Sequence, residues 1–94
     1  MNFILVVYDI SSDKRRTKLH NKLLDYGTPV QYSVFECNLT AEEIERLKKA
    51  VQRIVRPTKD HVRYYPICAS CLKKVDVIGG VDVLGEPPAA LVVG

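Results

Sequence analysis

A single acidic residue, Asp9, ends the apolar run at residues 3–8 and is followed closely by a basic cluster. A carboxylate is a hard ligand of the kind that Mg²⁺ takes, and this ion needs only one or two protein oxygens because it keeps several waters. Basic side chains on the same short stretch can bind phosphate oxygens. The junction therefore indicates metal-assisted chemistry on a phosphodiester. The alternative is a strand-end aspartate that accepts backbone N–H groups in the following turn.

The basic cluster breaks a local rule for the start of a helix. The macrodipole is positive there and favours acidic residues, yet only Asp13 follows this preference. A rule broken several times in one place is typical of a functional surface. Arg16 is the strongest candidate for a phosphate contact, whereas Lys14 and Arg15 could equally belong to a solvated helical face. The residues predicted to bind nucleic acid are Lys14, Arg15, Arg16 and Lys18.

Two aromatic residues, Tyr8 and Phe35, could stack on unpaired bases. The alternative is that both rings belong to the hydrophobic core, which is the commoner place for an aromatic side chain.

Length and composition indicate one globular domain. The chain has 94 residues, of which 47% are hydrophobic and 27% charged, with a formal net charge of +3. The first apolar run is too short for a membrane span or the core of a signal peptide, so we expect a cytoplasmic protein. Clustered positive charge favours an anionic partner, most commonly nucleic acid.

The first half of the chain predicts strand, helix and strand. Residues 2–9 lack alternation, which favours a central strand covered on both faces. Ser11 or Ser12 can cap a helix that ends at Gly27, in the left-handed conformation typical of a C-cap glycine. Its apolar stripe is formed by Leu19, Leu23, Leu24 and Tyr26. Residues 29–38 are rich in β-formers and could break near their middle into two strands.

The second half begins with the clearest helix start. Thr40 and Glu43 match a capping box, and Leu39 with Ile44 matches a hydrophobic staple. This helix should end at Arg56-Pro57. Residues 60–67 predict a strand whose Pro66 favours an edge or a strand end, and residues 74–78 a short strand before a turn at Gly79-Gly80.

This order predicts an α+β fold of the ferredoxin-like type, βαββαβ, with two helices on one face of an antiparallel sheet. We expect a main domain at residues 1–80 and a C-terminal strand and tail at residues 81–94. The tail is apolar around Pro87-Pro88 and has little core to join, so we expect it to contact a partner or a second copy of the chain.

Four segments occur together in a recognisable order: residues 7–10, the basic helix start, residues 27–37 and residues 62–66. In these segments the chain resembles the small CRISPR-associated endonuclease family that accompanies the spacer integrase, conventionally numbered two. The resemblance covers residues 1–80. The chain departs from some relatives at Lys18, where they carry arginine, and at Pro29, where they carry a basic residue.

The resemblance implies a homodimer whose C-terminal strand crosses onto the partner's sheet, with one Mg²⁺ held between the two copies of Asp9. It implies a metal-dependent nuclease on single-stranded RNA or double-stranded DNA that also assembles with the integrase. Asp9 matches the metal ligand of the family, Arg16 a basic position linked to activity, and Phe35 an aromatic near the cleft. We therefore expect Asp9, Arg16 and Phe35 to be the catalytic residues.

Cys68 and Cys71 form an isolated C-x-x-C pair, with Cys37 as the third cysteine. An odd number in a reducing compartment argues against a disulfide framework. Zinc normally takes four ligands, and Cys37, His20 or His61 are only speculative additions. No thioredoxin-like context surrounds the pair, so we expect reduced thiols lining a turn.

Two other functions remain open on the sequence alone. One is a DNA-binding scaffold for the integrase without meaningful catalysis, and the other is a toxin-type ribonuclease on the same fold.

Overall fold

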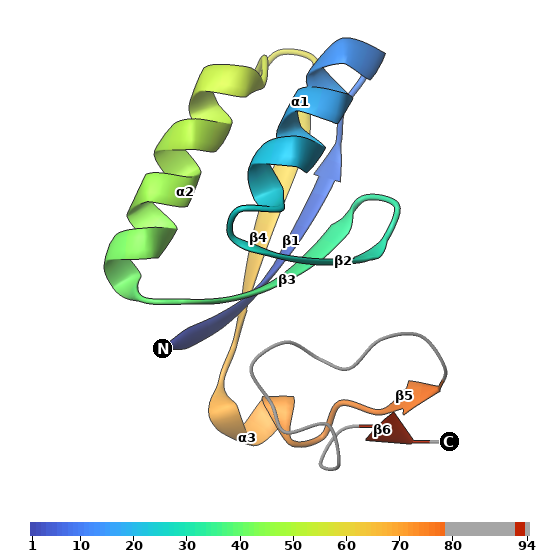
Figure 1. The fold of residues 1–94 in the computed structure, drawn as a ribbon, viewed down its shortest axis with the longest axis vertical. Coiled ribbons are helices and arrows are strands. Elements are labelled where there is room, and N and C mark those ends of the chain that lie inside the picture. The colour runs from blue at the N-terminus through green and yellow to red at the C-terminus, as the bar shows by residue number, and fades with distance from the viewer. Residues whose placement is uncertain (79–91, 94) are drawn as a thin grey trace.

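The computed structural model describes residues 1–78 and 92–93. The elements are β1 (Asn2–Asp9), α1 (Asp13–Leu23), β2 (Gly27–Gln31), β3 (Val34–Leu39), α2 (Ala41–Ile54), β4 (His61–Ile67), the short α3 (Ala69–Leu72), β5 (Val77–Ile78) and β6 (Val92–Val93). An antiparallel sheet has the strand order β2-β3-β1-β4, and α1 and α2 cover the same face of it (Figure 1). The predicted ferredoxin-like βαββαβ fold is confirmed.

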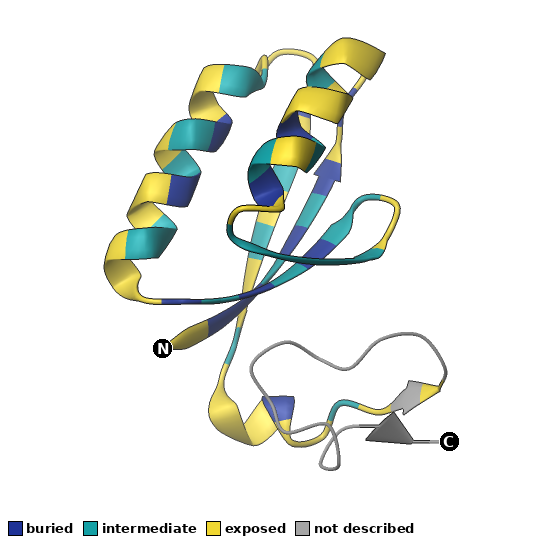
Figure 2. Cartoon of the chain, viewed as in Figure 1, coloured by how far each residue is buried: buried dark blue, intermediate teal, exposed yellow. Residues whose placement is uncertain are grey.

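The core lies between the sheet and the two long helices, as Figure 2 shows by the dark buried segments. Successive side chains of a strand point to opposite faces, so Ile4, Val6 and Tyr8 face the helices while Leu5 and Val7 face the other way. Strand β1 is central, as predicted. Only its helix-facing side is fully buried by the described part of the chain, because Leu5 and Val7 remain half-buried and Asp9 exposed. The opposite face of the sheet is open there.

Helix α1 begins as predicted but ends differently. Ser12 is the N-cap, and its hydroxyl accepts a hydrogen bond from the Arg15 backbone N–H at 3.3 Å. The helix ends at Leu23, and Leu24 is 49% exposed, so Leu24 does not belong to the apolar stripe. The prediction that Gly27 ends the helix in a left-handed conformation is wrong, because Gly27 is the first residue of β2.

Gly27 is required for a close approach of strands. A Cβ atom at this position would lie 2.4 Å from the backbone oxygen of Glu36 and 2.5 Å from the Cys37 sulfur. The oxygen belongs to the paired strand β3 and cannot move without disturbing the register of Gly27 with Cys37.

We expect Gly27→Ala to destabilise the protein by about 1–3 kcal/mol, the usual cost of forcing extra atoms into a packed region. Urea denaturation followed by circular dichroism measures this loss. Ala50→Gly on α2 is a useful comparison, because it lowers stability through helix propensity by about 1 kcal/mol without any clash. Unchanged stability of Gly27→Ala would show that the strands can separate at no cost.

The remaining elements follow the sequence with smaller differences. The predicted break in residues 29–38 is confirmed by β2 and β3, and the capping box of Thr40 and Glu43 is present. Helix α2 ends at Ile54, before the predicted Arg56-Pro57. Strand β4 pairs only with β1 among the described strands, so Pro66 lies on an edge strand as predicted.

The region after β4 differs most. Helix α3 was not predicted, and the strand expected at residues 74–78 is limited to β5, which pairs in parallel with β6. The expected turn at Gly79-Gly80 lies outside the described residues, as does the tail apart from β6. No helix in the described part of the chain is long and apolar enough to cross a membrane.

Candidate metal and nucleic-acid site

Asp9 is the exposed last residue of β1, on the open face of the sheet. Its carboxylate makes no hydrogen bond or ion pair within residues 1–78 and 92–93. The N–H of Ser11, in the turn that follows, donates to Asp60 instead. In the described residues, therefore, the Asp9 carboxylate does not accept hydrogen bonds from the backbone of the turn that follows it. Asp9 can accept an external ligand.

His61 lies directly opposite Asp9 in the antiparallel register of β1 and β4. Cross-strand partners point to the same face and have Cβ atoms about 4.5–5.5 Å apart. His61 is also exposed, so an imidazole stands beside the candidate metal ligand. From the sequence alone, His61 is only a speculative zinc ligand. Asp9 and His61 are 52 residues apart in the sequence, so their proximity becomes visible only from the strand register.

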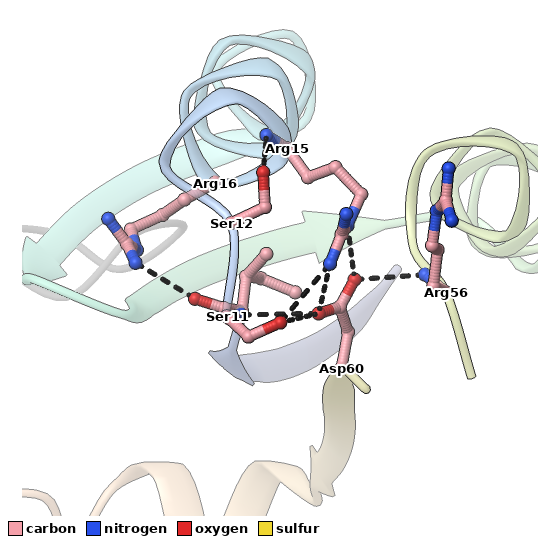
Figure 3. A network of polar contacts seen from close by, with 7 residues as sticks. Ser11, Ser12, Arg15, Arg16, Arg56 and Asp60 are labelled. Carbon is pink, nitrogen blue, oxygen red and sulfur yellow. Dashed lines mark hydrogen bonds and ion pairs between the residues drawn. The ribbon is translucent and has the colours of Figure 1, made fainter. Parts of the chain in front are cut away.

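Asp60 organises the chain around this strand end, and Figure 3 shows its network. Its side chain is buried and accepts hydrogen bonds from three segments of the chain. The donors are Ser11 N and Oγ, both at 3.2 Å, Arg15 Nε at 2.8 Å, Arg15 Nη2 at 3.1 Å and the Arg56 backbone N at 2.9 Å. The carboxylate thus joins the loop after β1, helix α1 and the segment after α2.

These contacts change the chemistry of both partners in the ion pair. The hydrogen bonds from the Arg15 side chain, and then those from the Arg56 and Ser11 backbones, hold the pKa of Asp60 well below its usual range. The same pair raises the pKa of Arg15. Asp60 therefore stays ionised at any ordinary pH.

Arg15 is held in the chain more firmly than the other predicted phosphate-binding residues. The sequence predicted it to bind nucleic acid, but its guanidinium is held by Asp60 and Ser11 and only 20% of its side chain is exposed. Its place in this network makes Arg15 a structural residue that fixes α1 on the sheet. The buried partner Asp60 could not be recognised from sequence, because it lies 45 residues away from Arg15 at an ordinary strand start.

Arg16 lies on the other side of the same helix turn. Its Nη2 donates to the Ile10 carbonyl at 2.9 Å and its Nη1 pairs with the exposed Asp13. The Ile10 contact anchors the guanidinium next to the residue that follows Asp9. Because 44% of the side chain remains exposed, the other N–H groups can reach a phosphate.

A basic groove runs between α1 and the end of α2, with a volume of about 440 Å³. Five cationic residues line it: Lys14, Arg15, Lys18, Arg53 and Arg56. Apart from Arg15, their side chains make no ion pair with any described residue. Arg53, at the end of α2, and Arg56, in the segment that follows it, were missed because they lie far along the chain from the cluster that the sequence singles out. An unneutralised groove of this kind favours a polyanion.

The aromatic candidates are core residues. Phe35 is fully buried, and its ring centroid lies 5.1 Å from that of His20 in an edge-on contact. Tyr8 is 3% exposed, and its hydroxyl donates to the Tyr32 carbonyl at 3.1 Å. Neither ring presents a face to a base, so the core alternative is confirmed. Any effect of Phe35 on activity would be exerted through packing.

The described residues contain no group of three or more His, Cys, Asp and Glu side chains that could hold a metal ion. Cys37 is fully buried in the core, where burial raises its pKa to about 11, whereas Cys68 and Cys71 are exposed to solvent, so the three thiols do not form one group. A metal at Asp9 must therefore use few protein ligands or ligands from a second chain.

The fold and site define a small ferredoxin-like α+β protein with an exposed acidic strand end and a basic groove between its two long helices. A family model described as CRISPR associated protein Cas2 matches residues 1–75, and the chain belongs to this family.

Individual relatives agree with this assignment. The "CRISPR-associated endoribonuclease Cas2 3" of Synechocystis sp. is 39% identical over 93 residues, which is 99% of this chain and 100% of that protein. The crystal structure of Streptococcus pyogenes Cas2 superposes with a TM-score of 0.72 at 30% identity, covering 82% of this chain and 99% of that one. A chain of a partial Cas6-RT-Cas1–Cas2 complex gives a TM-score of 0.75 at 27% identity, covering 93% and 100%.

Proposed function

We propose that this protein is a Mg²⁺-dependent endonuclease of CRISPR adaptation, which acts as a homodimer on single-stranded RNA or double-stranded DNA. The observation that carries the proposal is the exposed carboxylate of Asp9, unpaired within the described residues, with Arg16 anchored on the backbone carbonyl of the following residue, Ile10. The Synechocystis relative is named as an endoribonuclease, and a structural relative belongs to a complex with Cas1.

The residues at the strand end fit Mg²⁺ as half of a site. Asp9 supplies a hard oxygen ligand, and no described residue competes with the ion for it. Mg²⁺ is commonly held by one or two carboxylates. A second copy of Asp9 across a twofold axis would complete the pair without any further sequence. When bound, the ion would supply Lewis-acid stabilisation of a phosphoryl group and lower the pKa of a water.

The protein's own side chains bind and orient the substrate. Arg16 lies where it can contact a phosphate near Asp9, while Lys14 and Lys18 hold the flanking backbone as point charges. His61, opposite Asp9, is placed to accept or donate a proton at the same strand end.

The open face of the sheet supports the homodimer. Leu5 pairs in register with Tyr65, and Val7 with Val34, so these apolar side chains gather on the face opposite the helices. Tyr65 is 43% exposed. A second chain packed here would bury this patch, and Asp9 lies at the end of the same row of side chains.

Hydrolysis of labelled single-stranded RNA and duplex DNA, with Mg²⁺ and with EDTA, tests the catalytic proposal. We expect cleavage that requires Mg²⁺ on at least one substrate and returns when the ion is restored. Equal rates with Mg²⁺ and with EDTA would contradict it.

The basic groove favours a second function, a scaffold that grips nucleic acid for the integrase without cleaving it. The four cations other than Arg15 can each meet one phosphate along a strand. The two functions are compatible. If the protein binds nucleic acid but shows no Mg²⁺-dependent turnover, only the scaffold function would be supported.

The groove predicts a steep dependence of binding on salt. The affinity for duplex DNA should fall with a slope of about −0.9 per phosphate neutralised, in a plot of log K against log salt concentration. Lys18→Ala, Arg53→Ala and Arg56→Ala should each reduce the slope by about one such contact. Lys49→Ala removes an exposed cation of α2 outside the groove and should change it little. Fluorescence anisotropy across a salt series measures these slopes, and identical slopes in all variants would rule out the groove as a binding surface.

A further inference from the structure

The turn of helix α3 holds two cysteines that the proposed nuclease function does not use, Cys68 as its N-cap and Cys71 within it. Cys68 and Cys71 are both exposed, while Cys37 is buried in the core beneath the helices. Leu72 anchors the helix, because it is buried against Phe3 and packs with Ile67 and Val75. The two thiols therefore stand on a fixed turn that faces solvent.

The backbone of this turn places the two sulfurs on one side. The Leu72 N–H donates to the Cys68 carbonyl at 2.9 Å, and the Lys73 N–H to the Ala69 carbonyl at 3.2 Å. Residues three apart on a helical turn are neighbours with Cβ atoms about 5–6 Å apart. A disulfide needs about 3.5–4.5 Å, so a small rotation of the first residue of the turn is sufficient to join them.

The two thiols differ in their surroundings. The Cys68 sulfur lies 3.3 Å from the Ser70 hydroxyl, and hydrogen bonds from Ser70 and then Cys71 lower the pKa of Cys68 to about 7. The hydrogen bond to Cys68 and its negative charge raise the pKa of Cys71. Near neutral pH, Cys68 is thus substantially a thiolate while Cys71 keeps its proton. This asymmetry is what dithiol exchange requires.

We propose that Cys68 and Cys71 form a redox-active dithiol, in which Cys68 attacks low-molecular-weight disulfides and Cys71 resolves the product. The Cys68 thiolate bonds to one sulfur of oxidised glutathione and releases the first glutathione thiolate. Cys71 then loses its proton to solvent, attacks the Cys68 sulfur and releases the second glutathione. Two protein thiols are oxidised by two electrons to one disulfide, and one glutathione disulfide is reduced to two thiols.

Mass spectrometry of the reduced full-length protein after treatment with oxidised glutathione tests this proposal. We expect the wild type to lose two hydrogen atoms in mass without a lasting adduct, with a peptide map that joins Cys68 to Cys71. Cys71→Ser should instead trap one glutathione on Cys68. Iodoacetamide at pH 7 should alkylate Cys68 in Cys71→Ser roughly tenfold faster than it alkylates Cys71 in Cys68→Ser. In the wild type, where Cys71 is present, the alkylation rate of Cys68 should reach half its maximum at a pH of about 7.

Several outcomes would overturn the proposal. These are equal alkylation rates in the two single variants, a stable mixed disulfide on the wild type, and a disulfide that joins two chains. Zinc that remains bound through purification and protects both thiols from glutathione would also overturn it, because the pair would then be a metal site. All of these measurements are independent of nuclease activity.

Discussion

Asp9→Asn should abolish Mg²⁺-dependent hydrolysis while leaving the fold intact. The substitution keeps the size of the side chain but removes the charge that would hold the ion, and Asp9 makes no contact that stabilises the described chain. Metal-assisted stabilisation of a phosphoryl group is worth several kcal/mol, so we expect a loss of at least roughly a hundredfold in turnover. Initial rates under saturating Mg²⁺ measure it.

Asp25→Asn provides the matched control. Asp25 is another exposed aspartate, 3.8 Å from Lys22 at the far end of α1, and should leave turnover unchanged. The affinity for duplex DNA in EDTA should be similar in both variants, because the groove residues are untouched. A turnover of Asp9→Asn within a factor of about two of the wild type would remove Asp9 from the mechanism.

Asp60→Asn should be the most destabilising single substitution around the strand end. It leaves Arg15 without its charged partner and sets an amide N–H₂ against donors that now meet a carboxylate. We expect the melting temperature to fall by roughly 10 °C or more, measured by circular dichroism. Asp25→Asn should change it by only about 1–2 °C, since exposed ion pairs contribute little.

The low pKa of Asp60 also gives a pH dependence. The pKa of Asp60 is depressed in the folded state, so its contribution is fully present above the unfolded value of about 4 and is lost as the pH falls toward the folded value. Wild-type stability should therefore decline more steeply below about pH 4 than that of Asp60→Asn. Parallel declines in urea titrations over this range would contradict the assigned role of Asp60.

Local signals in the sequence were sufficient for most of the fold. Thr40 and Glu43 form their capping box within four residues, and β2 and β3 join through a turn where the sequence predicts a break. The position of Pro66 on an edge strand follows from its missing N–H. Such features depend on neighbours in the chain and need no tertiary information.

The failures concern contacts between distant segments. Gly27 was taken for a helix terminator, because a close approach to the Glu36 carbonyl across two strands leaves no local pattern. The pairing of Arg15 with Asp60 was missed, because the sequence shows the charge of Arg15 and not its partner 45 residues away.

The candidate site shows the same division. Asp9, Arg16, Lys14 and Lys18 were recognised because they lie within one stretch of chain, and the structure leaves all four accessible. Three neighbours were missed. The strand register places His61 beside Asp9, and the packing of α1 with α2 places Arg53 and Arg56 in the basic groove. Phe35 was assigned a role by resemblance, and its burial shows that it contributes to packing.

In the proposed dimer, two copies of Asp9 hold one divalent ion across a twofold axis. A crystal structure of the protein grown with Mn²⁺, with anomalous data collected near the manganese edge, tests it most directly. We expect one anomalous peak between the two Asp9 carboxylates, about 2.1 Å from an oxygen of each. Asp9 side chains on opposite outer surfaces of the dimer, with no peak near either, would contradict the claim.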